Sequence, residues 1–158
     1  MARRPRLVLM GAAALLMAMV ACSESTPTDP RDVEFHEDLG VDLDAMTRMD
    51  SGLYYQDLEE GEGEVAATGD AVAVEYRAWL STGALIDQSR ETAFQFRLGT
   101  GQVILGWEEG IPGMREGGER LLVVPPNLAY GPRGLPGQIP GDATLVFRVT
   151  LVEVFEDD

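Results

Sequence analysis

A segment dense in glycine and proline near the C-terminus limits the fold of this chain most strongly. It contains Gly131, Pro132, Gly134, Pro136, Gly137, Pro140 and Gly141. These residue types favour turns and interrupt helices and strands, so we expect one long loop here. Loops of this length in compact domains usually carry function. Residues 143–154 follow directly and are rich in Val, Leu, Phe and Thr, which predicts a closing strand.

A short helix is expected over residues 103–110, whose sequence is VILGWEEG. Ile104 and Trp107 are three positions apart, which is a helical spacing. We expect Gly110 to end the helix in a left-handed cap, and Pro112 prevents its continuation. Trp107 should then point inward, where its indole N–H adds a polar group to an otherwise apolar pocket.

Most of the remaining regular segments indicate strands. Residues 71–80 alternate apolar with other side chains, which predicts a strand with one buried face. Further strands are expected at residues 52–58, 84–87, 94–98, 120–125 and 144–154. Residues 39–49 are expected to form a short amphipathic helix ahead of them. The pattern predicts an α+β fold, in which a single helix packs on a mainly antiparallel sheet.

Residues 1–21 have the pattern of a secretory signal. Three arginines among the first six residues precede an apolar run at residues 7–21. This run is shorter than the about 20 residues that span a bilayer. Cys22, the only cysteine, follows the run, and the sequence Met-Val-Ala-Cys resembles the lipobox of bacterial lipoproteins. The resemblance implies that Cys22 carries a lipid; the alternative is a free thiol near the start of the mature chain.

Residues 22–50 are expected to form an acidic, flexible tether that leads to a domain at residues 51–158. The whole chain has 27 acidic and 12 basic side chains and a net charge of −15, and removal of a signal with three arginines makes it more acidic. Such a charge argues against binding of nucleic acid or electrostatic docking to anionic lipid. His36, the only histidine, has too few neighbouring ligands for a metal site, so we expect no metal and no cofactor.

Covalent catalysis has no candidate groups in residues 51–158. This range has no Gly-x-Ser-x-Gly elbow, no cysteine, no histidine and no phosphate-binding glycine loop. Hydrolysis and phosphoryl transfer therefore lack candidate residues in this range.

Six short motifs stand in order along residues 52–155. They are VEY at 74–76, the segment 83–90 with Asp87 and Ser89, FQFRLG at 94–99, GWEEG at 106–110, AYG at 129–131 and ATLVF at 143–147. Together they resemble the FKBP-type, macrolide-binding, peptidyl-prolyl cis-trans isomerases. The activity that this implies needs no covalent catalyst, because the barrier of about 18 to 20 kcal/mol is the resonance of the amide. A dry pocket that fits the twisted amide lowers that barrier. The resemblance implies a strongly bent, mainly antiparallel sheet of five or six strands wrapped around one short helix. It places the site between the start of the helix and the concave face of the sheet.

The resemblance also assigns roles to residues of this chain. The residues expected to act in catalysis are Asp87, Tyr130, Ile104 and Phe147. The Ile104 backbone N–H and the Tyr130 hydroxyl would donate to carbonyls beside the proline, and Asp87, oriented by Tyr76 and Arg90, would lie close to the twisted amide. Trp107 would form the floor under the prolyl ring. The residues expected on the walls and rim are Tyr76, Ile86, Phe94, Val103, Leu135 and Ile139. The implied partners are proline-containing polypeptides and macrolide inhibitors.

Two other functions stay open beside that of an enzyme. The same pocket would serve a non-catalytic chaperone or scaffold that binds proline-containing clients. A purely structural envelope lipoprotein is the third possibility, although it would not need Asp87, Tyr130 and Trp107 together. Taken singly, the aromatic residues are ordinary core and Asp87 is an ordinary turn residue. For all three functions we expect export to the cell envelope with a lipid anchor in the membrane, facing the periplasm in a Gram-negative cell.

Overall fold

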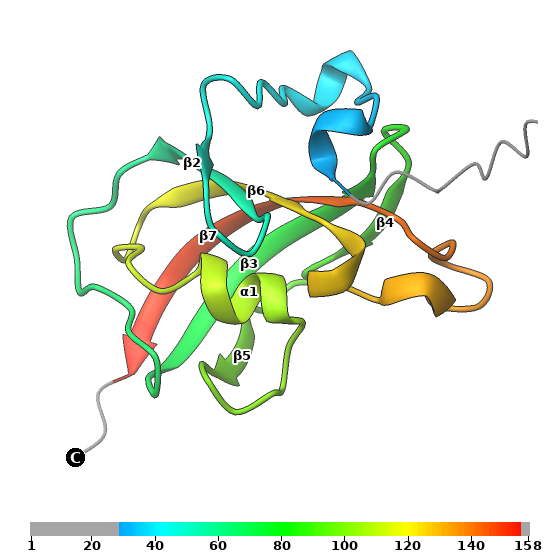
Figure 1. The fold of residues 1–158 in the computed structure, drawn as a ribbon. Coiled ribbons are helices and arrows are strands. Elements are labelled where there is room, and N and C mark those ends of the chain that lie inside the picture. Colours follow the sequence, from blue (N-terminus) through cyan, green and yellow to red (C-terminus); the bar gives the residue numbers. More distant parts are fainter. Residues whose placement is uncertain (1–28, 156–158) are drawn as a thin grey trace, which may run out of the picture.

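One antiparallel sheet organises the computed structural model, which describes residues 29–155 (Figure 1). Its strands are β1 (Thr47–Arg48), β2 (Tyr54–Glu59), β3 (Ala71–Leu80), β4 (Leu85–Gln88), β5 (Phe94–Arg97), β6 (Glu119–Val124) and β7 (Leu145–Phe155). They are arranged in the order β1-β2-β6-β7-β3-β4, and β5 pairs with β3 beside β4. The helices are α1 (Leu105–Gly110) and the 3-10 turns η1 (Pro30–Asp32), η2 (Glu37–Leu39), η3 (Pro126–Leu128) and η4 (Gly131–Arg133). This confirms the α+β fold, with seven strands in place of five or six.

Strands β3 and β7 form the longest pairing of the sheet. They pair from Ala71 opposite Phe155 to Leu80 opposite Leu145. The alternation of apolar residues located β3 at the predicted bounds, and the other predicted strands of the domain lie within two residues of their observed ends. Strand β4, which carries Asp87, pairs only with the end of β3 and so forms an edge of the sheet.

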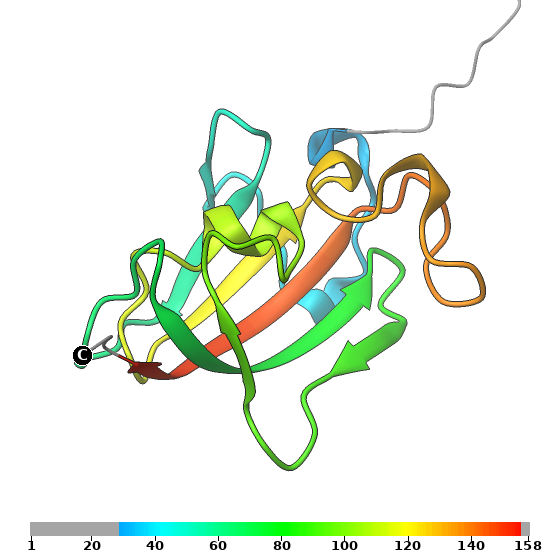
Figure 2. The ribbon, with the colours of Figure 1, turned by 90° about the horizontal axis from the view of Figure 1, so that it is seen from below.

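The helix α1 lies close against β6 because two of its residues are glycines (Figures 1 and 2). A Cβ atom on Gly106 would lie 2.4 Å from Val124, and one on Gly110 would lie 2.8 Å from Leu122. The prediction of a left-handed cap at Gly110 is wrong, since Gly110 is the last helical residue and Ile111 continues in right-handed backbone. Close packing on the sheet, and not chain reversal, explains this glycine.

The sheet carries buried residues on both of its faces. On one face α1 covers the main core, which includes Trp107, Leu122 and Phe147. On the other face, residues 29–49, here called the N-terminal strap, bury Leu39 and Met46. The buried strand residues beneath the strap are Leu121, Val123 and Val146. They alternate along β6 and β7 with residues of the main core, as side chains on opposite faces of a sheet must.

The strap differs from the two expectations for this part of the chain. A flexible tether was expected over residues 22–50, whereas the strap is packed on the sheet. A helix was expected over residues 39–49, whereas η2 ends at Gly40, whose φ of 65° is left-handed, and the chain continues through turns to β1. The large apolar residues of the strap share one cluster with strand residues far along the chain, so neither their number nor their spacing indicated this contact.

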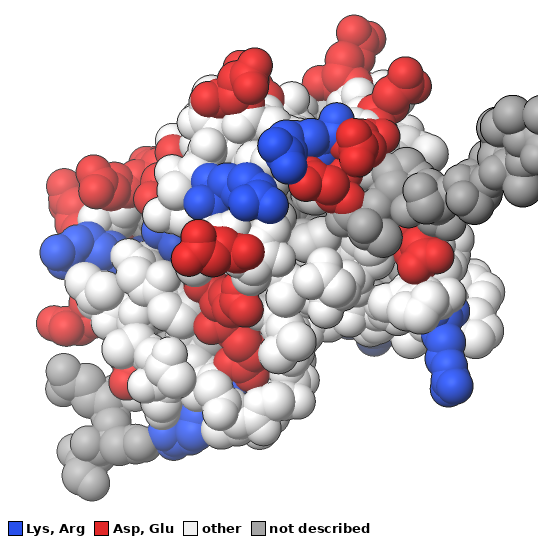
Figure 3. All heavy atoms as spheres, viewed as in Figure 1, with Lys and Arg blue, Asp and Glu red and all other residues white. Residues whose placement is uncertain are grey.

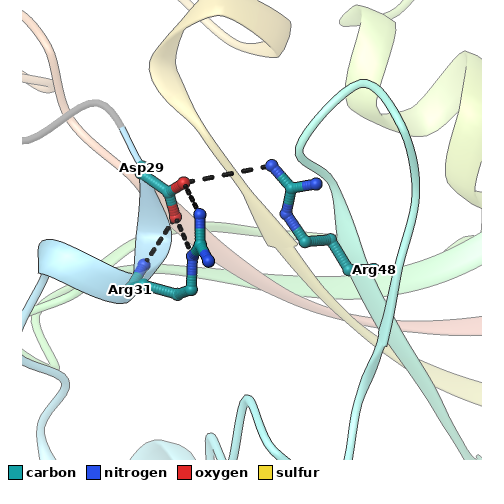
Figure 4. A network of polar contacts seen from close by, with 3 residues as sticks. All are labelled: Asp29, Arg31 and Arg48. Carbon is teal, nitrogen blue, oxygen red and sulfur yellow. Dashed lines mark hydrogen bonds and ion pairs between the residues drawn. The ribbon is translucent and has the colours of Figure 1, made fainter.

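Polar contacts fix the beginning of the strap (Figure 4). The Asp29 carboxylate accepts hydrogen bonds from the backbone N–H and the guanidinium of Arg31, and it lies 3.9 Å from the guanidinium of Arg48 on β1. The bond from Arg31 lowers the pKa of Asp29 well below its usual range. Farther along, the N–H of His36 donates to the carbonyl of Ser81 at 2.8 Å, in the turn between β3 and β4.

The expected signal at residues 1–21 and the expected lipidation site Cys22 lie outside the described residues. Within residues 29–155, no helix is long and apolar enough to cross a membrane.

Candidate functional site

An aromatic cluster surrounds Trp107, which α1 directs into the core with 4% of its surface exposed. The ring centroid of Trp107 lies 4.9 Å from that of Tyr76 on β3 and 5.5 Å from that of Phe147 on β7. Phe96 and Phe94 of β5 lie at 5.7 Å and 6.3 Å. Most of these pairs meet edge to face, which is the favourable arrangement for aromatic rings. Helix and sheet thus build one aromatic wall from four separate elements.

A small cavity opens beside this cluster. Its lining residues are Ala78, Ile86, Asp87, Tyr130, Leu135, Gln138, Ile139, Leu145 and Phe147. The glycine-rich loop contributes Leu135 and Ile139, which bond to each other in an isolated bridge. A Cβ atom on Gly134 would lie 2.1 Å from the Ile139 carbonyl, so this turn requires glycine. The loop expected to carry function therefore forms one side of an apolar cavity.

The Asp87 carboxylate is held at the rim of this cavity. One oxygen accepts a hydrogen bond from the Tyr76 hydroxyl at 2.8 Å, and the other accepts from the N–H of Gln88 at 2.9 Å. The expected contact with Tyr76 is present. Arg90 was expected to orient Asp87 as well, but no ion pair joins the two in the described part of the chain.

Two tyrosine hydroxyls near Asp87 stay protonated at neutral pH. Burial and the hydrogen bond to Asp87 raise the pKa of Tyr76 to about 12. Burial and the negative charge of Asp87 also raise the pKa of Tyr130. Tyr130 is 38% exposed, and its hydroxyl has no hydrogen-bond acceptor among residues 29–155. It can therefore donate a hydrogen bond to a bound molecule.

The start of α1, the helix that carries Trp107, offers a backbone hydrogen-bond donor. Ile104 precedes the helix in extended backbone, and its carbonyl accepts from the N–H groups of Trp107 and Glu108. Its own N–H has no acceptor within the described residues. Val103 and Ile104 are partly buried against the main core, together with Ile86 and Leu135. The residues expected in catalysis and substrate binding therefore all lie either in the aromatic cluster, in the cavity lining or at this helix start.

Arg120 supports the site and was not predicted from the sequence. The residue is 6% exposed, and its guanidinium pairs with both oxygens of Asp57 at 2.6 Å and 3.1 Å and donates to the Gly110 carbonyl at 2.8 Å. It also lies 4.7 Å from the ring centre of Tyr55. The arginine thus ties the end of α1 to β2 and β6. Arg120 lies near the start of β6, where an arginine side chain is normally solvated. No local sequence signal therefore indicated that it is buried.

Glu108 holds the loop before the helix. Its carboxylate accepts from the N–H of Gly101 at 3.0 Å and from the N–H of Gly99. The loop between β5 and α1, which carries Val103, is thereby fixed to the helix that carries Trp107.

The arrangement suits binding and distortion of an apolar group better than bond cleavage. The cavity joins apolar walls to the Asp87 carboxylate, the Tyr130 hydroxyl and the Gln138 amide, and no serine, cysteine or histidine lines it. Among residues 29–155, no group of three or more metal-ligating side chains is present.

Comparisons with known proteins agree with this geometry. Residues 62–152 match the family model of the FKBP-type peptidyl-prolyl cis-trans isomerases. An FK506-binding protein of Neisseria meningitidis serogroup B is 46% identical over 107 residues, which cover 66% of this chain and 98% of that protein.

Solved structures show the same fold. A peptidyl-prolyl cis-trans isomerase from Pseudomonas syringae superposes with a TM-score of 0.65 at 30% identity, covering 71% of this chain and 82% of that one. FkpA from Escherichia coli superposes with a TM-score of 0.65 at 41% identity, covering 75% of this chain and 55% of that one.

Proposed function

The chain belongs to the FKBP-type peptidyl-prolyl cis-trans isomerases, and from this premise we propose that it isomerises Xaa-Pro bonds of exported proteins in the cell envelope. The observation that carries the assignment of the site is the apolar cavity that joins Asp87, Tyr130 and Phe147 beside the Trp107 cluster. Its occupant is the prolyl ring of a client, and macrolides compete for the same place.

Binding positions the client through two donors. The Tyr130 hydroxyl and the Ile104 N–H bond to carbonyls that flank the proline, while Phe147 and Trp107 contact the prolyl ring. Immobilised carbonyls and an immobilised ring leave the Xaa-Pro amide as the bond that can rotate. Exclusion of water by Ile86, Leu135 and Ile139 removes the solvent that would stabilise the planar, polar amide.

Asp87 favours the twisted amide through its charge. A planar amide places negative charge on its carbonyl oxygen by resonance, and twisting removes much of that charge. A carboxylate beside the oxygen repels the planar form more than the twisted form. Because only interactions that are stronger in the transition state accelerate a reaction, this difference lowers the barrier. No covalent step, proton transfer or cofactor takes part.

The activity is tested by the cis-to-trans rate of a short Leu-Pro peptide with the purified protein. We expect clear acceleration, and we expect Asp87→Ala to lower kcat/KM by about tenfold or more, which corresponds to about 1.4 kcal/mol of transition-state stabilisation. The matched control is Glu153→Gln, an exposed carboxylate of β7. A folded protein that binds the peptide without acceleration would instead be a proline-binding chaperone or scaffold.

The envelope location rests on the N-terminal sequence. The basic start, the apolar run and Cys22 at its end together support export and lipidation. Cells that express the protein with radiolabelled palmitate should label the wild type and not Cys22→Ser, and only the wild type should sediment with membranes. Equal fractionation of the two proteins would refute the lipid anchor and leave the isomerase activity unaffected.

A further inference from the structure

A charged hollow lies on the face of the sheet away from α1, outside the cavity described above. Its volume is about 440 Å³, within the range of small-molecule and peptide-side-chain sites. Its lining residues are Glu75, Tyr76, Arg77, Gln88, Ser89, Arg90, Glu119, Arg148 and Thr150. The side chains of Arg77 and Arg148 alternate along their strands with residues of the main core, which places them on the opposite face.

Three arginine side chains line this hollow. Arg77 and Arg148 are direct cross-strand partners in β3 and β7, an arrangement in which like charges repel. Arg148 lies 4.0 Å from Glu119, while neither Arg77 nor Arg90 has an ion pair or side-chain hydrogen bond among the described residues. Three arginines face two carboxylates, Glu75 and Glu119, so the hollow is net positive.

The rest of the molecule has the opposite charge. The chain carries a net charge of −15, and acidic side chains are spread over the face shown in Figure 3. An acidic molecule is therefore repelled by most of the surface and attracted at the hollow. The local field orients such a molecule as well as binding it.

The hollow is separated from the catalytic cavity by one edge strand. Asp87 and Gln88 are successive residues of β4, so their side chains point to opposite faces. Asp87 borders the cavity and Gln88 borders the hollow. Three hydrogen bonds join Ser89 to Tyr76 and fix the loop that follows β4. The Ser89 N–H and hydroxyl donate to the Tyr76 carbonyl at 2.9 Å and 3.4 Å, and the Tyr76 N–H donates to the Ser89 hydroxyl at 3.0 Å.

A polypeptide bound at the cavity can reach the hollow around this edge. A third depression, lined by Asp87, Arg90 and Phe94 among others, lies along the path. Three or four extended residues span about 10 to 14 Å, enough to pass one strand. The arginine fork is the side chain best suited to a carboxylate, which it binds with two parallel hydrogen bonds.

We propose that the hollow around Arg77, Arg90 and Arg148 binds acidic side chains of the client, and that the enzyme thereby selects prolines with Asp or Glu about three to five positions away. The inference rests on the proposed isomerase function, and it adds the class of substrate.

The test compares three peptides with the purified full-length protein. All three have a Leu-Pro centre. The first carries three Glu residues about three to five positions before the proline, and the second carries three Glu residues at the same distance after it. The third carries Gln in place of Glu on both sides. We expect kcat/KM to rise about threefold or more for one Glu peptide at low salt, and the gain to vanish at about 0.5 M salt.

Variants of the arginines test whether the hollow causes the gain in kcat/KM for the Glu peptide. Arg77→Gln combined with Arg148→Gln should abolish the gain and leave kcat/KM for the Gln peptide unchanged. The control Arg133→Gln removes an exposed arginine of the glycine-rich loop and should keep the gain. Equal kcat/KM for Glu and Gln peptides at low salt would overturn the proposal, as would a gain that survives the double variant.

A binding measurement separates this proposal from the isomerase function. The fluorescence anisotropy of a labelled Glu-rich peptide without proline should show binding that the double variant weakens about threefold or more. Loss of turnover on every peptide, with this binding intact, would refute the enzyme and keep the acidic-ligand site. Absence of binding beside normal turnover would refute the site and keep the enzyme.

Discussion

Tyr76 is the residue that connects the aromatic cluster to the Asp87 carboxylate. Its ring packs at 4.9 Å from Trp107, and its hydroxyl donates to Asp87. The second oxygen of Asp87 accepts only from the N–H of the next residue. Among the described residues, Tyr76 is therefore the one side chain that orients this carboxylate from another strand.

Tyr76→Phe tests this orienting role. The change keeps the ring and removes one hydrogen bond, so we expect a loss of about 0.5 to 1.5 kcal/mol in the free energy of unfolding. Because Asp87 then keeps only the hydrogen bond from the Gln88 N–H, its carboxylate is less well oriented and kcat/KM should fall about two- to tenfold. Tyr54→Phe, on the opposite face of the sheet, is the control for removal of a phenol. Unchanged kcat/KM in Tyr76→Phe would show that Asp87 needs no orientation from β3.

The pH dependence of the site follows from its two phenols. The pKa of Tyr76 is raised to about 12 and that of Tyr130 is raised as well, whereas tyrosines of the unfolded chain titrate near 10. The folded protein holds these protons more tightly, so their contribution to stability is complete below about pH 10 and is lost as the pH rises toward 12.

We therefore expect kcat/KM to stay level from pH 7 to about 10, since both hydroxyls remain donors. A pH–rate profile with the short Leu-Pro peptide, together with a check of folding by circular dichroism, measures this. A decline near pH 8 to 9 that disappears in Tyr130→Phe would show that the pKa of Tyr130 is not raised.

At the scale of elements, the contact between α1 and β6 sets the depth of the site. Gly106 and Gly110 let the helix approach Val124 and Leu122, and Arg120 clamps the end of the helix to β2. The position of Trp107 on this helix depends on that approach. A side chain at either glycine must lift the helix or displace the strand.

Gly106→Ala measures the cost of lifting the helix. The added Cβ would lie 2.4 Å from Val124, and such overpacking costs about 1 to 3 kcal/mol, against which alanine regains up to about 1 kcal/mol of helix propensity. We expect a net loss in urea denaturation. Val124→Ala makes room, so the double variant should be more stable than the sum of the two single changes predicts. Strict additivity would show that the helix does not press on Val124.

At the scale of the whole molecule, the strap makes the folded unit larger than the catalytic domain. The family match covers residues 62–152, yet residues 29–49 bury Leu39 and Met46 against the sheet. The apolar residues of β6 and β7 under the strap would otherwise face water. The strap also bonds to the turn at Ser81, next to the edge strand that carries Asp87.

Leu39→Ala tests whether the strap stabilises the domain. Leu39 is 5% exposed, and removal of a buried leucine side chain costs about 2 to 5 kcal/mol. We expect a lower urea midpoint with little change of slope. Glu34→Ala, an exposed change in the same segment, should leave the midpoint unaltered. A Leu39→Ala protein as stable as the wild type would mean that the sheet face is stable without its cover.

Local sequence signals were sufficient to predict strands β2 to β7, the helix α1 and the family, but they missed β1 and indicated a helix over residues 39–49 that the structure does not form. Alternation in β3 and the turn residues of the glycine-rich loop are local signals, and the ordered motifs around Asp87, Trp107 and Tyr130 marked the residues that the structure gathers. Tertiary structure decided what depends on distant partners. Arg120 is 63 positions from Asp57, Gly110 is explained only by the strand it touches, and the strap packs on a face that its own residues do not specify. The periodicity of a sequence shows which side of a helix or strand is apolar. Which other segment packs against that side depends on residues far away in the chain, so only the tertiary structure shows it.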